Sequence, residues 1–295
     1  NPGGIHAEGV LAKRSLAASR EKIAIELGCK AREVVFVSGG TEANNLSILG
    51  VMRKLQLLKM PMQDTHWIVS SIEHPSVLEC FSEIERCGAD VTYVDPDERG
   101  IISPEKIVAA LKPHTKLISI AWANHELGVI QPIRTIARAV RAHTAETLIH
   151  TDAGQAPLYL HPHVHTLEVD LMSIDSGKLY GPRGIGAVYI SDRTDLARVM
   201  YGGGQERGLR AGTENVALAA GFAAAFEVIS KERLDESHRM KVLRDDFAKK
   251  IQLMLPQIQL NTDLKLSLPH MLNISIPGIQ SEYVTLSLDS AGFGI

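Results

Sequence analysis

A lysine and an aspartate in the middle of the chain have residue types and surroundings that suit covalent chemistry on a bound aldehyde. Lys178 lies in the glycine-rich stretch 176–184, and Asp152 lies in the sequence His-Thr-Asp-Ala-Gly-Gln at 150–155. A lysine amine forms a Schiff base with an aldehyde, and a carboxylate beside a pyridinium nitrogen keeps that nitrogen protonated. The pair therefore fits pyridoxal 5′-phosphate (PLP), although each residue alone is better explained as a surface lysine in a turn and a helix cap.

A glycine turn at residues 38–42 has the features of a phosphate-binding segment. It reads Ser-Gly-Gly-Thr-Glu and joins an expected strand to an expected helix. Gly40 lets backbone N–H groups approach an anion, the helix N-terminus favours negative charge, and Thr41 adds a hydroxyl donor. The alternative is a simple capping turn with Thr41 as the helix cap.

Two further polar residues follow strands and fit the same ligand. His74, in Glu-His-Pro, could stack on a pyridine ring and move protons at neutral pH. Gln155, three residues after Asp152, could donate to the phenolic oxygen of the cofactor. An ordinary turn histidine and a solvated glutamine are the competing interpretations.

A long glycine-rich stretch at residues 202–215 contains two arginines, Arg207 and Arg210. Glycines and cations in this number favour anion binding or an interface over a flexible linker. Thr213 is expected to cap the helix that follows.

Composition excludes several classes of protein. The chain has 295 residues, of which 45% are hydrophobic and 22% charged, with a net charge of −3, typical of soluble globular proteins. We therefore expect no nucleic-acid stripe, no membrane attachment and no secretory leader. Three cysteines cannot build a disulfide framework, which favours reduced thiols in the cytoplasm.

Helical and strand patterns alternate along the chain, which predicts an α/β fold with a mostly parallel sheet covered by helices on both faces. The segments at 38–41, 73–74 and 124–126, together with Asp152 and Lys178, each fall just after a strand, where ligands bind in such sheets. Helices are expected at 6–27, 41–58, 75–87, 103–111 and 132–142, and strands at 34–37, 67–69, 91–94, 116–121, 147–151, 171–174 and 186–190.

The chain is expected to divide into residues 1–230, a large PLP-binding domain, and residues 231–295, part of a small C-terminal α/β domain. From residue 227 the composition shifts to long polar helices over 230–254. A short strand at 271–275 and a helix from Ser281 follow.

Together these segments resemble the cysteine desulfurases of the class V aminotransferase family, in the NifS/IscS-like branch, from residue 1 to residue 295. The resemblance implies the PLP-dependent transferase type I fold, L-cysteine as substrate and a homodimer. The segments that carry it are residues 36–45, 72–74, 124–131, 150–155, 178–186 and 202–215.

The resemblance also implies individual roles. Lys178 carries PLP and removes the substrate α-proton, Asp152 faces the ring nitrogen, and His74 stacks on the ring and handles the thiol proton. Thr41 holds the phosphate, and Thr213 reaches the phosphate in the partner subunit. The sulfur passes to an enzyme cysteine with release of alanine, and then to an acceptor such as an iron–sulfur scaffold protein.

The chain departs from the family pattern beside the lysine. Asp175 and Gly177 replace a serine and a histidine that touch the phosphate, so Ser176 is expected to supply the lost hydroxyl. An aspartate beside a phosphate is unfavourable unless it turns away or pairs with a cation. His125 replaces an asparagine that faces the cofactor or substrate.

The loop that carries the sulfur-accepting cysteine in the family follows the phrase at residues 288–295. Cys29, Cys80 and Cys87 are expected to be structural. We therefore expect this chain to bind PLP without completing desulfuration. The alternatives are a selenocysteine lyase, another class V PLP enzyme, or a catalytically inactive assembly partner of the same fold.

Overall fold

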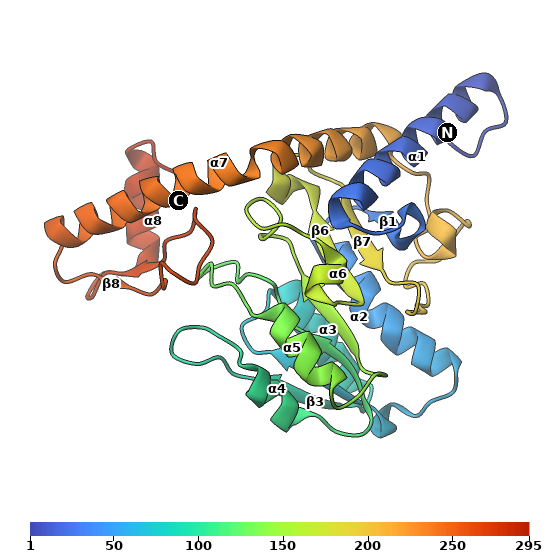
Figure 1. Ribbon diagram of the computed structural model, residues 1–295, viewed down its shortest axis with the longest axis horizontal. Coiled ribbons are helices and arrows are strands. Elements are labelled where there is room, and N and C mark those ends of the chain that lie inside the picture. The colour runs from blue at the N-terminus through green and yellow to red at the C-terminus, as the bar shows by residue number, and fades with distance from the viewer. Residues whose placement is uncertain (295) are drawn as a thin grey trace.

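The computed structural model describes residues 1–294 and is built around a seven-stranded sheet of order β1-β7-β6-β5-β4-β2-β3 (Figure 1). All neighbouring strands are parallel except the pairs that β7 forms with β1 and β6. Every strand except β7 therefore ends at the same edge, which confirms the mostly parallel sheet. The strands are β1 Val34–Val37, β2 His66–Ser70, β3 Asp90–Val94, β4 Thr115–Ser119, β5 Leu148–Asp152, β6 Leu171–Asp175 and β7 Gly186–Ile190.

Helices cover both faces of this sheet, because apolar side chains of each strand alternate between two buried clusters. The cluster on one face includes residues of α2 and α3, and the cluster on the other includes residues of α1, α4, α5, α6 and α7. The helices are α1 Ala7–Leu27, α2 Gly40–Leu57, α3 Pro75–Arg86, α4 Pro104–Ala110, α5 Ile133–Arg141, α6 Val164–Leu167, α7 Val216–Met254 and α8 Ser281–Ser290, with short 3-10 helices at Ala31–Glu33, Met62–Asp64, Ser176–Leu179 and Glu206–Gly208.

Local signals set the ends of the early helices. Helix α1 ends at Gly28, which takes the left-handed conformation (φ 65°) that glycine adopts without strain. Helix α3 begins with Pro75 at its first position and with His74 as its cap, whose ring nitrogen accepts from the backbone N–H of Ser76. The boundaries predicted for both helices are confirmed to within one residue.

Helix α7 is longer than the sequence predicts. It runs for 39 residues from Val216 and includes the segment expected to form separate helices from 230. The cap is Asn215, whose side chain accepts from the backbone N–H of Leu218, so the prediction of Thr213 as cap is wrong. The division at residue 230 falls inside this helix and stays a prediction. The expected strand at 271–275 is reduced to β9 Ile274–Ser275, which pairs with β8 Gln259–Leu260.

A buried acid ties the glycine-rich stretch to the sheet. Both carboxylate oxygens of Glu206 accept from the Arg20 guanidinium, at 2.7 and 2.6 Å, and one of them also accepts from the backbone N–H of Phe36 at 2.8 Å. The Glu206 side chain is 2% exposed. The loop is therefore fixed against α1 and β1.

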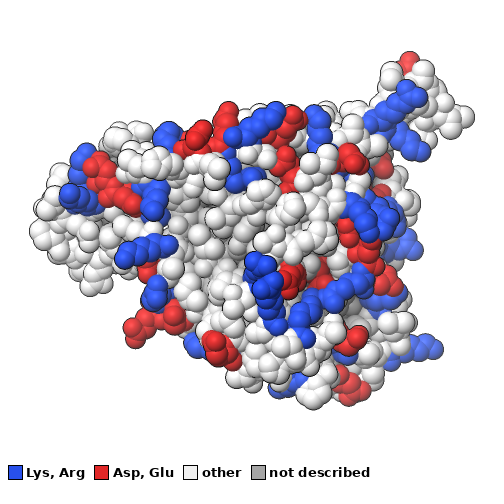
Figure 2. All heavy atoms as spheres, viewed as in Figure 1, with Lys and Arg blue, Asp and Glu red and all other residues white. Residues whose placement is uncertain are grey.

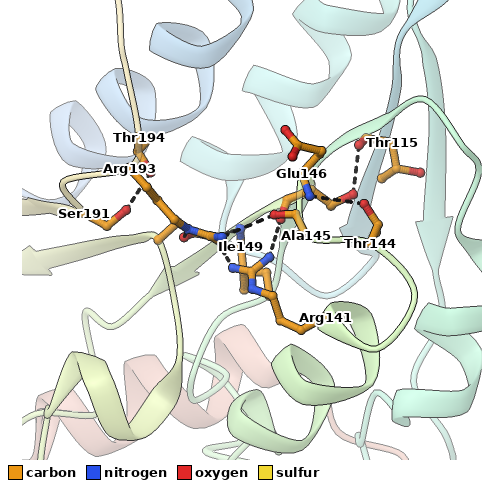
Figure 3. Close-up of polar contacts among 11 residues, drawn as sticks. Thr115, Arg141, Thr144, Ala145, Glu146, Ile149, Ser191, Arg193 and Thr194 are labelled. Atoms are coloured by element: carbon orange, nitrogen blue, oxygen red, sulfur yellow. Dashed lines mark hydrogen bonds and ion pairs between the residues drawn. The ribbon is translucent and has the colours of Figure 1, made fainter.

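A second buried acid, Asp170, joins three segments next to the amino-terminal ends of β5 and β6. Its carboxylate accepts from Arg141 of α5 at 2.5 Å, from Arg193 after β7, and from the backbone N–H of Ile149 at 2.8 Å. Figure 3 shows the Arg141 and Arg193 side chains converging near Ile149. The Asp170 side chain is 2% exposed, so this cluster fixes the strands at the edge opposite to the polar segments.

The charged residues of the surface are mixed in sign. Figure 2 shows acidic and basic side chains interspersed over the face viewed there. Within residues 1–294, no helix has both the length and the hydropathy needed to cross a bilayer.

Candidate active site

The predicted residues meet in one cavity at the edge where the parallel strands end. The cavity measures about 310 Å³ and is lined by segments that follow β1, β2, β4, β5 and β6. This placement is expected for a ligand site in a parallel sheet. The lining residues are Gly40, Thr41, Asn44, His74, Ser76, Ala121, Ala123, His125, Asp152, Gly154, Gln155, Asp175 and Lys178.

Asp152 is held by a hydrogen bond to each carboxylate oxygen. One oxygen accepts from the backbone N–H of Gly154 at 2.8 Å, and the other accepts from the side-chain amide of Asn44 at 2.7 Å. Asn44 lies on α2 and is buried. The carboxylate is thus fixed in direction by two separate elements, as a group that must face a ring nitrogen requires.

A chain of hydrogen bonds continues from Asn44 to His74. The Asn44 amide also lies 2.9 Å from Ser76 Oγ, which lies 2.8 Å from His74 Nδ1. The backbone N–H of Ser76 donates to the same Nδ1 at 3.1 Å. A backbone N–H can only donate, so Nδ1 carries the lone pair and the neutral ring carries its proton on Nε2. His74 is thereby prepared to donate from Nε2.

Sequence reasoning missed Asn44 and Ser76. The signal for Asn44 was available, since it lies three residues after Thr41 on the helix that begins at the glycine turn, and such residues share a face. Ser76 is the second residue of α3, and the backbone N–H at this position commonly donates to the side chain of the cap residue.

Lys178 lies on the 3-10 turn Ser176–Leu179 directly after β6 and lines the cavity. Within residues 1–294, its amine makes no hydrogen bond or ion pair that would hold it away from a ligand. Gln155 lines the same cavity from the segment after β5. Both residues therefore line the same cavity, and their roles toward a cofactor stay predictions.

His125 lies against His74 in an edge-to-face arrangement, with 5.1 Å between the ring centroids and 71° between the ring planes. Burial is the largest cause that lowers the pKa of His125, and the nearby negative charges of Glu126 and Asp152 oppose this decrease. Burial therefore disfavours the charged form of this ring, which brings a second imidazole into the cavity.

The phosphate end of the cavity contains Asp175, the acid that departs from the family pattern. Asp175 accepts from the backbone N–H of Gly40 at 2.9 Å and from the backbone N–H of Gly177 at 2.7 Å. The ring-binding residues therefore fit PLP, since Asp152 and Lys178 line one cavity, but the start of α2 already carries a carboxylate.

Two predicted phosphate contacts lie outside the cavity. The Ser176 side chain is fully buried, its Oγ has no hydrogen-bond partner, and it fills the space against Gly181. The prediction that Ser176 supplies a hydroxyl to the phosphate is therefore wrong, because the 3-10 turn directs this side chain to the protein interior. Thr213 is exposed on its loop, and its contact with a partner subunit stays a prediction.

The two arginines of the glycine-rich stretch bind this chain itself. Arg210 donates to Glu42 at 2.9 Å, and Glu42 also accepts from the backbone N–H of Ser38 at 2.6 Å. Burial opposes ionisation of Glu42, but these hydrogen bonds outweigh it and lower the pKa of Glu42. Arg207 donates to the carbonyl of Arg32. Both arginines therefore bind groups of this chain and are not free to bind an anion. The contacts of Arg210 and Ser38 with Glu42 fix the glycine turn before α2.

A buried acid next to His74 supports the cavity wall. Glu73 lies 4% exposed beside His74, and its carboxyl accepts from the backbone N–H of Ala121 at 2.9 Å. Burial raises the pKa of Glu73 to about 8, and the negative charge of Asp152 adds to this increase. The sequence places Glu73 in the segment 72–74 just after a strand, but it does not show that this side chain is buried.

Replacing Glu73 by glutamine should change how stability depends on pH. Folded Glu73 keeps its proton up to about pH 8, whereas an unfolded glutamate releases it near its model value of 4.5. Between these values the wild-type protein loses stability as the pH rises, by up to about 1.4 kcal/mol per pH unit. Glu73→Gln cannot ionise, so its stability relative to the wild type should increase from roughly pH 5 to pH 8.

Urea unfolding at both pH values measures this change. Glu79→Gln, at an exposed position of α3, is the matched control and should show no such increase. If the free energies of unfolding of the wild type and of Glu73→Gln differ by the same amount at pH 5 and at pH 8, the prediction is contradicted.

Comparison with known proteins shows the family of this chain. The family model for aminotransferase class-V matches residues 1–295, and the chain belongs to that family. A cysteine desulfurase IscS of Dictyoglomus turgidum is 37% identical over 292 residues, which are 99% of this chain and 72% of that protein. The resemblance drawn from the sequence motifs is thereby confirmed.

Solved structures agree with this assignment. A NifS-like protein superimposes with a TM-score of 0.94 at 34% identity, covering 100% of this chain and 79% of that chain. A structure described as SspA in complex with cysteine superimposes with a TM-score of 0.82 at 32% identity, covering 99% of this chain and 79% of that chain. The predicted α/β fold of PLP-dependent transferases is confirmed.

Proposed function

We propose that this chain is a PLP-dependent cysteine desulfurase that takes sulfur from L-cysteine. The observation that carries the proposal is the position of Lys178, with an unpaired amine among residues 1–294, in the same cavity as the doubly hydrogen-bonded Asp152. The similarity to an IscS desulfurase and to a cysteine-bound structure supports the choice of substrate.

Each residue of the site has a separate role toward the cofactor or the substrate. Bound PLP supplies an electron-accepting ring that stabilises negative charge at the substrate α-carbon. Lys178 holds the cofactor and moves the α-proton, and Asp152 keeps the ring nitrogen protonated. Gln155 would donate to the phenolic oxygen of the cofactor. His74, with its proton on Nε2, exchanges a proton with the substrate thiol.

The sulfur goes to a thiol other than the cysteines of this chain. Burial raises the pKa of Cys29 and of Cys80 to about 12, and each is raised further by a neighbouring glutamate. The pKa of Cys87 is raised by burial and by Glu83. A thiolate is the reactive form, so all three thiols are poor sulfur acceptors at neutral pH.

Hydrogen exchange at the substrate tests the proposal because it does not require sulfur transfer. The chain is incubated with PLP and L-cysteine in deuterium oxide, and the mass of the recovered cysteine is measured. Exchange of the α-hydrogen is expected, and alanine formation should increase with the concentration of an added thiol, because the cysteines of this chain are poor sulfur acceptors. No exchange would favour a catalytically inactive assembly partner instead. Comparing sulfide release with selenide release from L-selenocysteine separates a desulfurase from a selenocysteine lyase.

We also propose a homodimer, a cytoplasmic location and a sulfur acceptor such as an iron–sulfur scaffold protein. The exposed position of Thr213, on a loop fixed by Glu206 and Arg210, supports a role at a subunit contact. Light scattering should give twice the mass of 32.1 kDa. A monomer mass that persists at high concentration would contradict the homodimer.

A further inference from the structure

The start of helix α2 is a place where an anion is favoured. The helix has 18 residues, and its first N–H groups point out of the N-terminus with partial positive charge. Gly40 N–H is one of these groups, and Asp175 Oδ2 accepts from it at 2.9 Å. A side chain of this protein therefore already occupies part of this anion-binding position.

The same carboxylate also caps the turn that carries Lys178. Asp175 Oδ1 accepts from the backbone N–H of Gly177 at 2.7 Å, and Asp175 is the cap residue of the 3-10 turn Ser176–Leu179. One side chain thus connects the helix start and the lysine turn, which are 135 residues apart in the sequence.

Three glycines leave room for this carboxylate. A Cβ atom at Gly39 or at Gly40 would lie 3.3 Å from Asp175 Oδ2, and a Cβ atom at Gly177 would lie 3.2 Å from Asp175 Oδ1. Contacts this short are tighter than ordinary packing, so side chains at these positions would push Asp175 aside. The three glycines therefore form a closely fitted site for the Asp175 carboxylate.

We propose that Asp175 determines the cofactor specificity of this cavity by competing with the 5′-phosphate for the N-terminus of α2. This inference rests on the proposed PLP function. A phosphate dianion at that terminus meets the negative charge of Asp175 at short range, which lowers its affinity by about 10- to 100-fold. The chain therefore distinguishes only weakly between PLP and pyridoxal, which has no phosphate.

Titration of the full chain with both ligands tests this competition. Binding of PLP and of pyridoxal is followed by absorbance, and bound ligand is fixed by borohydride and located by peptide mapping at Lys178. The measured quantity is the ratio of the pyridoxal Kd to the PLP Kd. Differences in the reactivity of the two aldehydes cancel when this ratio is compared between variants.

Two substitutions isolate the charge. Asp175→Asn removes the charge and keeps the size, and Asp175→Ser also removes the bulk. Both should raise the ratio about 10- to 100-fold by tightening PLP binding, with pyridoxal binding little changed. The control Asp64→Asn removes the same charge at an exposed position of the 3-10 turn Met62–Asp64 and should leave the ratio unchanged.

The outcomes separate this inference from the proposed function. If the wild type binds PLP at Lys178 and both Asp175 variants have the same ratio of pyridoxal Kd to PLP Kd as the wild type, the competition is refuted. The proposed PLP function would still stand. If neither ligand is trapped on Lys178 in any variant, the proposed function fails, and the inference with it. Trapping of PLP only after Asp175→Ser or Asp175→Asn would support the competition in its strongest form.

Discussion

Lys178→Ala is expected to abolish α-hydrogen exchange of L-cysteine and covalent attachment of PLP, while leaving the fold intact. Lys178 lines the cavity and has no structural hydrogen bond among residues 1–294, so its loss removes the reactive amine and little packing. A positioned acid–base group contributes about 10²- to 10⁴-fold to rate. We expect exchange to fall at least about 10³-fold, measured by mass spectrometry of recovered cysteine.

A second lysine provides the matched control for this experiment. Lys249→Ala removes an exposed lysine of α7 and should keep full exchange and full PLP attachment. Circular dichroism checks that both variants fold. Exchange in Lys178→Ala equal to that of the wild type would show that another group removes the α-proton.

Asp170→Asn is expected to destabilise the protein by about 3 kcal/mol. The substitution keeps the size of the side chain but leaves Arg141 and Arg193 without a buried negative partner. Breaking a buried ion pair on one side costs about 3 to 5 kcal/mol, and the lower value applies because the Arg193 side chain is 43% exposed and partly hydrated. Urea unfolding measures the change.

Asp192→Asn is a close control for the loss at Asp170. Asp192 also pairs with two cations, Lys30 and Arg32, but all three side chains are largely exposed. Exposed ion pairs contribute little, so this variant should unfold near the wild-type urea concentration. Equal shifts in the two variants would show that the burial of Asp170 does not determine its contribution.

Local patterns predicted the sheet and most of its helices correctly. Strand periodicity, Gly28 after α1 and Pro75 at the start of α3 act within a few residues, so the sequence displays them directly. The prediction failed at α7 because its exposed polar second half differs in composition from its first half. That first half buries Phe222 and Phe226 in the cluster that includes α1. The two halves nevertheless form one continuous helix.

The sequence predicts that the candidate residues lie at one edge of the sheet, but it does not predict the hydrogen bonds that hold them. Lys178, Asp152, His74 and Gln155 stand directly after strands, and the topology of a parallel sheet brings such residues together. The contact of Asn44 with Asp152 joins residues that are 108 positions apart. Only the folded arrangement of α2 against β5 brings such partners together.

The side-chain directions in the turn beside Lys178 also could not be predicted from the sequence. Asp175 and Ser176 are neighbours with polar side chains, and the sequence alone does not say which one faces the cavity. The 3-10 turn after β6 directs the Ser176 side chain into the interior. It directs the Asp175 carboxylate toward the backbone N–H of Gly40 at the start of α2. Which side chain meets the phosphate position is therefore decided by the conformation of this turn.

Peptide mapping after borohydride reduction in the presence of PLP shows whether this cavity holds the cofactor. We expect a pyridoxyl group on the peptide that contains Lys178, and an absorbance change of the bound cofactor when L-cysteine is added before reduction. A label spread over exposed lysines, or no label at Lys178 even at saturating PLP, would contradict the assignment of this cavity as the cofactor site.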